Sequence, residues 1–188
     1  TFLFDNLGDV YQKFTKTEDI RKAKSDGRIV VLWYCQHCTD YMGRDLSKLE
    51  LLKRQGVKIV HIAHNQRNFY GDGGSERTDC GLSNLGMEFV AKMNELGLLI
   101  DTSHTGQRTT MECAENSKDG IVSIHTGCRG VYDHPHNKTD EVLKAIAEGD
   151  GVAGIYMSVN FLSKRGTITD WLNHIDHAVK VMGIDHVG

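Results

Sequence analysis

Short apolar runs alternate with helix-like segments along most of this chain, and that alternation restricts the fold more than any other feature. Each run is bounded by Gly or by polar residues, as is typical of buried strands in a parallel sheet. Strict strand–helix alternation predicts one parallel sheet with helical connections. The expected strands are Arg28–Tyr34, Val57–Ala63, Leu96–His104, Gly120–His125 and Gly151–Val159, with a further strand beginning in Gly183–Gly188. The expected helices are Asp9–Asp26, Leu46–Arg54, Asn84–Glu95, Thr105–Lys118, Thr139–Glu148 and Thr169–Met182.

Two long polar loops, Asn65–Ser83 and Thr126–Lys138, follow the carboxyl ends of expected strands. Long loops at that end are the arrangement of the active face of a (β/α)8 barrel. A complete barrel needs about 250 residues, whereas this chain has 188. We therefore predict an α/β fold in which residues 1–188 form a single domain, an incomplete TIM barrel covering about strands 3 to 8. The alternative is a doubly wound open sheet, but no Gly-rich phosphate-binding fingerprint follows the first expected strand of this sequence.

Two histidines stand at equivalent places in this pattern. His104 and His125 each end an expected strand, and one helix separates the two strands. In a parallel sheet these imidazoles lie at the same edge, where they can converge on one ion, and neutral imidazole is a common zinc ligand. The alternative is two unrelated histidines that are hydrogen-bonded to loop backbone.

Composition argues against several classes of function. The chain is 39% hydrophobic and 25% charged with a formal net charge of −3, which is ordinary for a globular domain. Its slight acidity and dispersed Lys and Arg argue against a nucleic-acid partner. No apolar run approaches the roughly 20 residues of a transmembrane segment. The odd number of cysteines, five, does not indicate a disulfide framework, so we expect free thiols and a cytoplasmic location.

The segment Cys35-Gln36-His37-Cys38 follows the first of the long expected strands and leaves three interpretations open. It resembles a redox motif, which requires a thiol of lowered pKa at a helix N-terminus. The second interpretation is that its cysteines are structural thiols, which is the commoner case. The third interpretation is metal coordination by His37 together with one of the cysteines.

Several longer motifs occur in an order that resembles one family of hydrolases. They are Gly81-Leu82-Ser83, Met93-Asn94-Glu95-Leu96-Gly97, Ile100-Asp101-Thr102-Ser103-His104, Ser123-Ile124-His125, His136-Asn137-Lys138-Thr139-Asp140, Gly149-Asp150-Gly151-Val152, His174-Ile175-Asp176-His177 and Gly183-Ile184-Asp185-His186-Val187-Gly188. From about Thr17 to its last residue, the chain resembles the membrane (renal) dipeptidase family, peptidase family M19. The resemblance implies a TIM-barrel metallohydrolase of the amidohydrolase type with a two-zinc site.

The resemblance assigns roles to three histidines of this sequence. His104 and His125 match the two histidines that hold the second zinc, and His64 matches the histidine that contacts the substrate carbonyl and the tetrahedral intermediate. The family's His-x-Asp pair is expected before Thr1. Its last-strand Asp, which handles proton transfer, is expected after Gly188. His174 lies on an expected helix, away from the strand ends, and is predicted to be structural.

Two positions depart from the family pattern. The metal-bridging Glu is expected at Gln36 or His37, and neither is a carboxylate; the chain thus resembles a branch that has Gln there. His136 stands where the family has an Arg that binds the substrate carboxylate, and imidazole cannot form the bidentate contacts of a guanidinium. Arg67 or Arg77, from the loop after His64, is a candidate replacement.

These observations predict a zinc-dependent hydrolase that cleaves a dipeptide or a similar small amide with a metal-activated water. The alternative is a weakened or repurposed barrel that binds one metal or none and acts as a binding protein or on another substrate. The predicted metal ligands are His104 and His125, with Gln36 or His37 as a third. His64 is the predicted catalytic residue, and it binds substrate together with His136, Arg67 and Arg77. One zinc ion is favoured over two, and a homodimer is left open.

Overall fold

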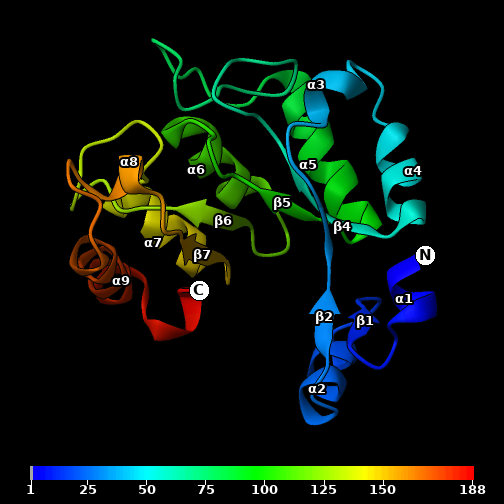
Figure 1. The fold of residues 1–188 in the computed structure, drawn as a ribbon. Coiled ribbons are helices and arrows are strands. Elements are labelled where there is room, and N and C mark those ends of the chain that lie inside the picture. Colours follow the sequence, from blue (N-terminus) through cyan, green and yellow to red (C-terminus); the bar gives the residue numbers. More distant parts are fainter. Residues whose placement is uncertain (1) are drawn as a thin grey trace.

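A five-stranded parallel sheet organises the structure, a computed structural model that describes residues 2–188 (Figure 1). The strands lie in chain order, each hydrogen-bonded to the next. They are β3 (Trp33–Cys35), β4 (Val57–His61), β5 (Leu99–Asp101), β6 (Val122–Thr126) and β7 (Val152–Ile155). Sequential order without reversal is the order of a barrel wall, whereas a doubly wound sheet reverses direction at a switch point. The prediction of a parallel α/β sheet is therefore confirmed.

Helices connect these strands, and each longer helix packs against the next one along the chain. The longer helices are α4 (Lys48–Gln55), α5 (Asn84–Leu96), α6 (Gln107–Asn116), α7 (Asp140–Glu148) and α9 (Ile168–Met182). Two short helices, α3 (Thr39–Met42) and α8 (Val159–Leu162), follow β3 and β7. This side-by-side packing resembles the outer helical layer of a barrel. None of the helices in residues 2–188 is long and apolar enough to cross a membrane.

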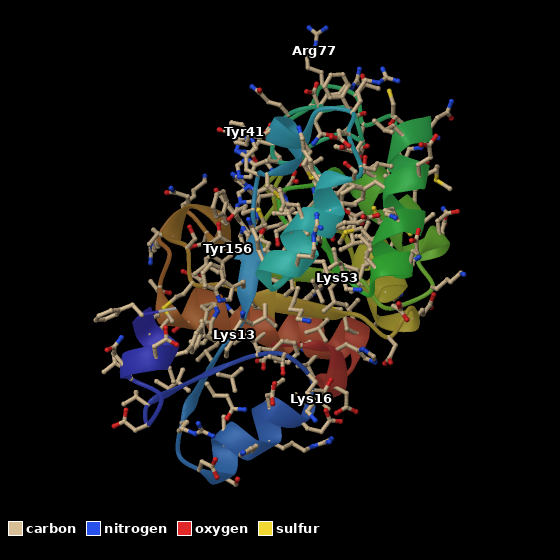
Figure 2. The ribbon with its side chains drawn as sticks, turned by 90° about the vertical axis from the view of Figure 1, so that its right-hand side faces the viewer. Lys13, Lys16, Tyr41, Lys53, Arg77 and Tyr156 are labelled. Carbon is tan, nitrogen blue, oxygen red and sulfur yellow. The ribbon has the colours of Figure 1, made fainter. Side chains whose placement is uncertain are left out.

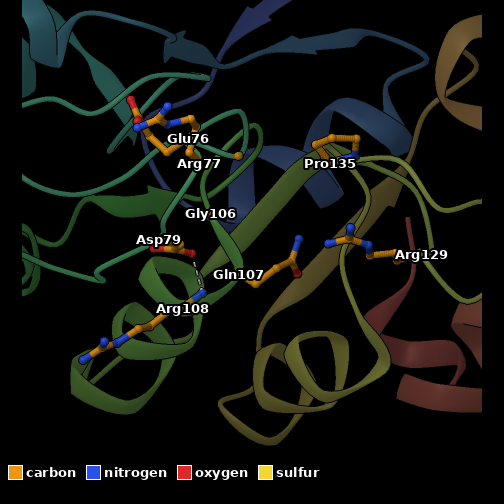
Figure 3. Close-up of a pocket in the computed structure, with 10 residues that line it drawn as sticks. Glu76, Arg77, Asp79, Gly106, Gln107, Arg108, Arg129 and Pro135 are labelled. Carbon is orange, nitrogen blue, oxygen red and sulfur yellow. Dashed lines mark hydrogen bonds between the residues drawn. The ribbon is translucent and has the colours of Figure 1, made fainter.

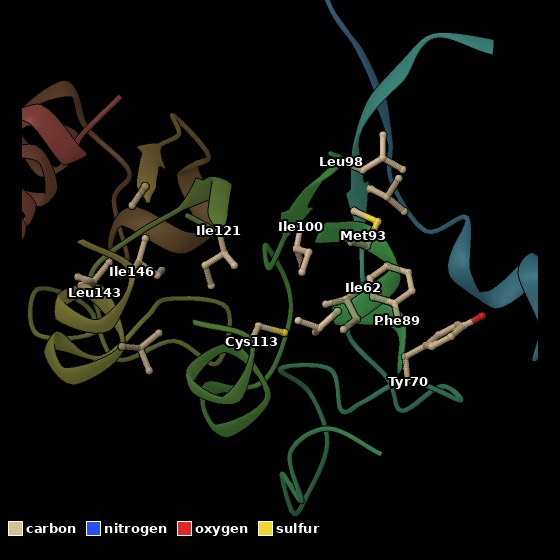
Figure 4. Packing of buried hydrophobic residues seen from close by; sticks show 14 of the residues in the cluster. Ile62, Tyr70, Phe89, Met93, Leu98, Ile100, Cys113, Ile121, Leu143 and Ile146 are labelled. Carbon is tan, nitrogen blue, oxygen red and sulfur yellow. The ribbon is translucent and has the colours of Figure 1, made fainter. Parts of the chain in front are cut away.

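The hydrophobic core lies between the sheet and this helical layer (Figure 4). Ile100 of β5 and Ile121 before β6 pack in one buried cluster with Phe89 and Met93 of α5 and with Ile146 of α7. Burying side chains of this size stabilises the fold by about 1.5–3 kcal/mol each. This packing fixes the strands, so that their carboxyl ends hold the loops described below.

The first 30 residues differ from the sequence prediction. The expected helix Asp9–Asp26 is wrong in its first half, where β1 (Tyr11–Lys13) forms a two-stranded parallel sheet with β2 (Ile29–Val31). α1 (Phe2–Asn6) precedes β1, and α2 (Glu18–Ser25) begins only after a turn. That turn is fixed by the Asp19 carboxylate, which accepts hydrogen bonds from the backbone N–H groups of Thr15 (2.8 Å) and Lys16 (3.0 Å).

The expected strand in Gly183–Gly188 begins only at the end of this segment. A 3₁₀ turn, η1 (Ile184–His186), comes first. Val187 then bridges Ala153 in parallel, and Gly188 exchanges backbone hydrogen bonds of 2.9 Å with Ala153 and Ile155 of β7. The His186 ring donates a hydrogen bond from Nδ1 to the Gly151 carbonyl at 2.8 Å. This side-chain bond holds η1 against the amino end of β7.

Candidate metal centre

A group of imidazoles gathers at the carboxyl ends of the central strands. The cluster lies on β4, on β6 and in the segments that follow β3, β4, β5 and β6; its members are His37, His61, His64, His104, His125 and His136. We call these residues the histidine cluster. Neighbouring strands of a parallel sheet end at the same edge, so residues far apart in sequence meet here.

The three histidines singled out from the sequence lie at the centre of the cluster. The His64 and His104 rings stack with centroids 4.1 Å apart, and the His104 and His125 centroids are 4.9 Å apart. The His136 ring meets His104 edge to face at 4.2 Å. One potential ligand atom from each of His104, His125 and His136 lies within 4.8 Å of the other two. The structure thus brings together the residues that the strand-end pattern predicted to converge.

A buried carboxylate sets the geometry where β5 ends. Asp101 accepts hydrogen bonds from the backbone N–H of Ser103 (3.1 Å), from the backbone N–H of Ile124 in β6 (3.0 Å) and from the Tyr34 hydroxyl (2.6 Å). His104 follows with a positive φ of 59°, which is uncommon outside Gly. The Asp101 side chain therefore joins β3, β5 and β6, and the turn that it stabilises points the His104 ring into the cluster.

Asn65 selects the tautomer of His104. Its Oδ1 atom accepts a hydrogen bond from His104 Nδ1 at 2.9 Å. Because the amide oxygen is only an acceptor, the proton lies on Nδ1, and the lone pair of Nε2 is available to a metal ion. Sequence reasoning missed this residue, although its place directly after His64 at the start of the long loop was a signal.

We expect Asn65→Ala to weaken zinc binding about 10- to 100-fold, the usual effect of removing a group that orients a metal-bound histidine. Equilibrium zinc titration against a chelating indicator measures this change. Asn116→Ala removes a comparable amide from exposed positions on α6 and should leave the affinity unchanged. An Asn65→Ala variant with the parental affinity would contradict this role for Asn65.

His61 has a structural role that the sequence did not reveal. It is fully buried, its Nε2 atom donates to the Ser103 carbonyl, and its Nδ1 accepts a long hydrogen bond of 3.4 Å from the His37 backbone N–H. Both ring nitrogens are thus engaged with backbone. His61 links the end of β4 to the turn after β5 and to the segment after β3. It thereby helps to position the other histidines of the cluster.

Burial lowers the pKa of five of these imidazoles. It lowers the pKa of His104 to about 2, with a smaller effect from the neighbouring His136. It lowers the pKa of His136 to about 3 and that of His61 to about 4. The pKa values of His64 and His125 are also lowered, mainly by burial. These imidazoles are therefore neutral near pH 7, which is the form that binds metal ions.

The structure separates the two candidates for a third ligand. Gln36 Nε2 lies 3.5 Å from His125 Nε2, so the Gln36 amide reaches the cluster. The His37 ring instead donates from Nε2 to the Asp40 carboxylate at 2.6 Å, while its face stacks on His64 with centroids 4.7 Å apart. Of the two positions where a bridging carboxylate was expected, Gln36 is the one directed at His125.

The nearby cysteines do not have the properties of a redox pair. Cys38 donates from its thiol to the Cys35 carbonyl at 3.5 Å, and both cysteines are free. Burial raises the pKa of the Cys38 thiol, whereas redox chemistry requires a lowered one. The structural interpretation of these thiols is therefore favoured over the redox one.

The two arginines considered for substrate binding have different surroundings. Arg67 forms an ion pair with Asp72, and its Nη2 also donates to the Thr78 carbonyl at 3.2 Å. Arg77 has no ion pair among the described residues and projects from the tip of the loop after β4 (Figure 2). It lines a cavity of about 390 Å³ between this loop, the start of α6 and the loop after β6 (Figure 3). In that cavity the Asp79 carboxylate accepts a 2.7 Å hydrogen bond from the Arg108 backbone N–H.

His174 lies outside the cluster, as the sequence predicted. It is fully buried on α9, where Nδ1 accepts from the Cys128 backbone N–H at 2.8 Å and Nε2 donates to the Leu162 carbonyl at 3.0 Å. These bonds attach α9 to the loop after β6 and to α8. The structural role expected for this histidine is confirmed.

Comparison with known proteins decides the family. The sequence profile of the membrane dipeptidase family, peptidase family M19, matches residues 8–188. The chain belongs to this family. An uncharacterized dipeptidase of Schizosaccharomyces pombe is 36% identical over 139 residues, which are 71% of this chain and 34% of that protein. The dipeptidase verJ of Clonostachys rogersoniana is 31% identical over 144 residues, or 73% of this chain and 36% of that protein.

Solved structures agree with this assignment and with the fold. An amidohydrolase from Pseudomonas aeruginosa is 36% identical with a TM-score of 0.87 over 99% of this chain and 57% of its own. A metallopeptidase from Rhodobacter sphaeroides, bound to a phosphinate mimic of the dipeptide L-Ala-D-Ala, is 26% identical with the same TM-score of 0.87, over 95% of this chain and 54% of its own. The chain thus spans about a third of these curated relatives and somewhat over half of these solved chains. Its fold is that of part of an M19 amidohydrolase barrel.

Proposed function

We propose that the protein containing this chain is a zinc-dependent hydrolase that cleaves a dipeptide or a similar small amide. The observation that carries the proposal is the convergence of His64, His104 and His125 at the ends of parallel strands, with neighbouring ring centroids 4.1 and 4.9 Å apart. Family membership and the dipeptide mimic bound to the Rhodobacter sphaeroides relative support the same substrate class.

His104 and His125 suit zinc as a ligand pair. Both are neutral, Asn65 presents the Nε2 lone pair of His104, and nitrogen donors are preferred by zinc over magnesium or calcium. Zinc bound there supplies a water of lowered pKa and polarises the scissile carbonyl. The ring of His125 is flanked by Tyr156 at a centroid distance of 5.3 Å, so an aromatic side chain limits water access on that side.

His64 is placed to bind the reacting carbonyl. Its lowered pKa keeps the imidazole neutral, first through burial and second through the neighbouring His37. A neutral imidazole N–H donates a hydrogen bond to the oxygen on which negative charge develops. Arg77 is the better candidate of the two arginines for the substrate carboxylate, because Asp72 already holds Arg67.

Activity of the full-length protein tests this function directly. The zinc-loaded protein should hydrolyse dipeptides, lose this activity on chelation and regain it when zinc is returned. A protein that binds zinc but turns over neither dipeptides nor related small amides would instead support the alternative of a repurposed barrel. Amino-acid release, followed by chromatography, distinguishes the two outcomes.

Gln36→Glu is expected to raise the zinc content of the full-length protein from one ion toward two. Two adjacent dications repel each other strongly, and a bridging carboxylate offsets that repulsion where an amide cannot. His37→Glu is the matched comparison and should change little, because position 37 is directed toward Asp40. Atomic emission after dialysis gives the stoichiometry. Two zinc ions per chain in the unmodified protein would show that the carboxylate is dispensable.

A further inference from the structure

His136 is buried with neither ring nitrogen bonded. Its exposed fraction is 4%, and both Nδ1 and Nε2 lack a hydrogen-bond partner. Leaving a buried polar group without a partner destabilises a fold. Other members of the histidine cluster, including His37, His61 and His104, have a ring nitrogen bonded to protein. The unpaired nitrogens of His136 therefore indicate a ligand that the protein itself does not supply.

The surroundings of His136 hold its ring in a fixed place. Phe161 stacks on it with centroids 4.6 Å apart and planes 20° from parallel. The backbone N–H of His136 donates to His134 Nδ1 at 3.2 Å. The ring packs against that of His104, at a centroid distance of 4.2 Å and an interplanar angle of 83°. These contacts hold the His136 ring beside His104.

Resting on the proposed function, we propose that His136 is a metal ligand and completes a three-histidine site with His104 and His125. One potential ligand atom from each residue already lies within 4.8 Å of the others. A tetrahedral zinc ion at about 2.0–2.1 Å from each nitrogen places them about 3.3 Å apart, so modest ring rotation closes the site. Three imidazoles leave a fourth position for water or substrate, as in catalytic zinc sites.

This assignment accounts for both departures from the family pattern together. The site gains an imidazole at position 136 and has an amide, Gln36, where a carboxylate was expected beside His125. A third neutral ligand strengthens the binding of a single ion. A single ion does not need the negative charge that offsets the repulsion between two adjacent ions. His136 then does not bind a substrate carboxylate, and recognition of that group passes to a cationic side chain, for which Arg77 is available.

Cobalt binding tests the assignment with a readout independent of activity. The metal-free full-length protein is titrated with Co²⁺, and its visible ligand-field absorption is followed. We expect His136→Phe, which preserves the aromatic stack on Phe161, to weaken binding about 100-fold and to abolish the tetrahedral spectrum. His177→Phe, a histidine of α9 bonded to Asp140, is the matched control and should retain both. Thermal melting without metal confirms that each variant folds.

A second variant reports coordination directly. His136→Cys should give a thiolate-to-cobalt charge-transfer band in the near ultraviolet, which arises only if the side chain at position 136 binds the ion. The unmodified protein, which has five other cysteines, is the reference, so the band counts only where the unmodified protein lacks it. Absence of a band specific to His136→Cys, with parental affinity and spectrum in His136→Phe, would overturn the assignment. If His104→Phe and His125→Phe still lost metal in that case, the proposed function would stand without it. Absence of Co²⁺ and Zn²⁺ binding by the unmodified protein would reject both.

Discussion

His104→Ala is expected to remove most of the zinc from the full-length protein. His104 is central to the histidine cluster, with ring contacts to His64, His125 and His136, and its free Nε2 lone pair is oriented by Asn65. Removing a group that only orients a metal ligand weakens metal binding about 10- to 100-fold. Removing the ligand itself should weaken zinc binding by at least that much. Atomic emission after exhaustive dialysis measures the effect.

The control for this experiment is His177→Ala. His177 is a partly buried histidine whose ring is bonded to Asp140 at 2.7 Å, away from the cluster. Its substitution should leave the zinc content at the parental value. Equal zinc in His104→Ala and the parent protein would remove the basis for placing a metal at the ends of β5 and β6, and with it the proposed chemistry.

His64→Ala should reduce kcat about 10²- to 10³-fold while leaving zinc content unchanged. That magnitude is typical for removal of one hydrogen-bond donor to a developing oxyanion. His64 stacks on His104, but it has no place in the group of ligand atoms formed by His104, His125 and His136. We therefore expect kcat to fall in this variant while its zinc content stays the same.

Steady-state kinetics on a dipeptide, with metal analysis of the same samples, tests this prediction. KM should change less than kcat, because the His64 contact strengthens as charge develops on the oxygen. His177→Ala again serves as the comparison and should retain the parental kcat. A His64→Ala variant that loses zinc would reassign His64 as a ligand, and one with unchanged kcat would end its catalytic role.

The loop after β4 contributes to the site through its backbone as well as its side chains. Gly73 packs so closely on the Asn65 backbone that a Cβ atom there would overlap it. The Gly74 N–H donates to the His104 carbonyl at 2.6 Å. The loop therefore supports both Asn65 and His104, and this close approach accounts for the glycine at position 73.

Local patterns in the sequence predicted much of the fold. Short apolar runs with Gly boundaries identified the central strands. β4 lies within the expected Val57–Ala63, and β6 begins within the expected Gly120–His125 and extends one residue beyond it, to Thr126. The same reasoning failed at Tyr11–Lys13, where a strand pairs with distant Ile29–Val31. It also missed the 3₁₀ turn at Ile184–His186 that precedes the pairing of Val187 with Ala153. In both places the partner lies far away in sequence, which no local window contains.

What the sequence determined by itself was the parallel α/β architecture and the meeting of His104 with His125. Both follow from the spacing of apolar residues and from the order of strands and helices along the chain, since the carboxyl ends of adjacent parallel strands share one edge. Only the tertiary structure decided that Gln36 rather than His37 reaches His125, that Arg67 is held by Asp72, and that His136 is buried with its ring nitrogens unpaired. These side chains lie on loops, and the position of a loop side chain is set by long-range packing and hydrogen bonds rather than by its neighbours in sequence.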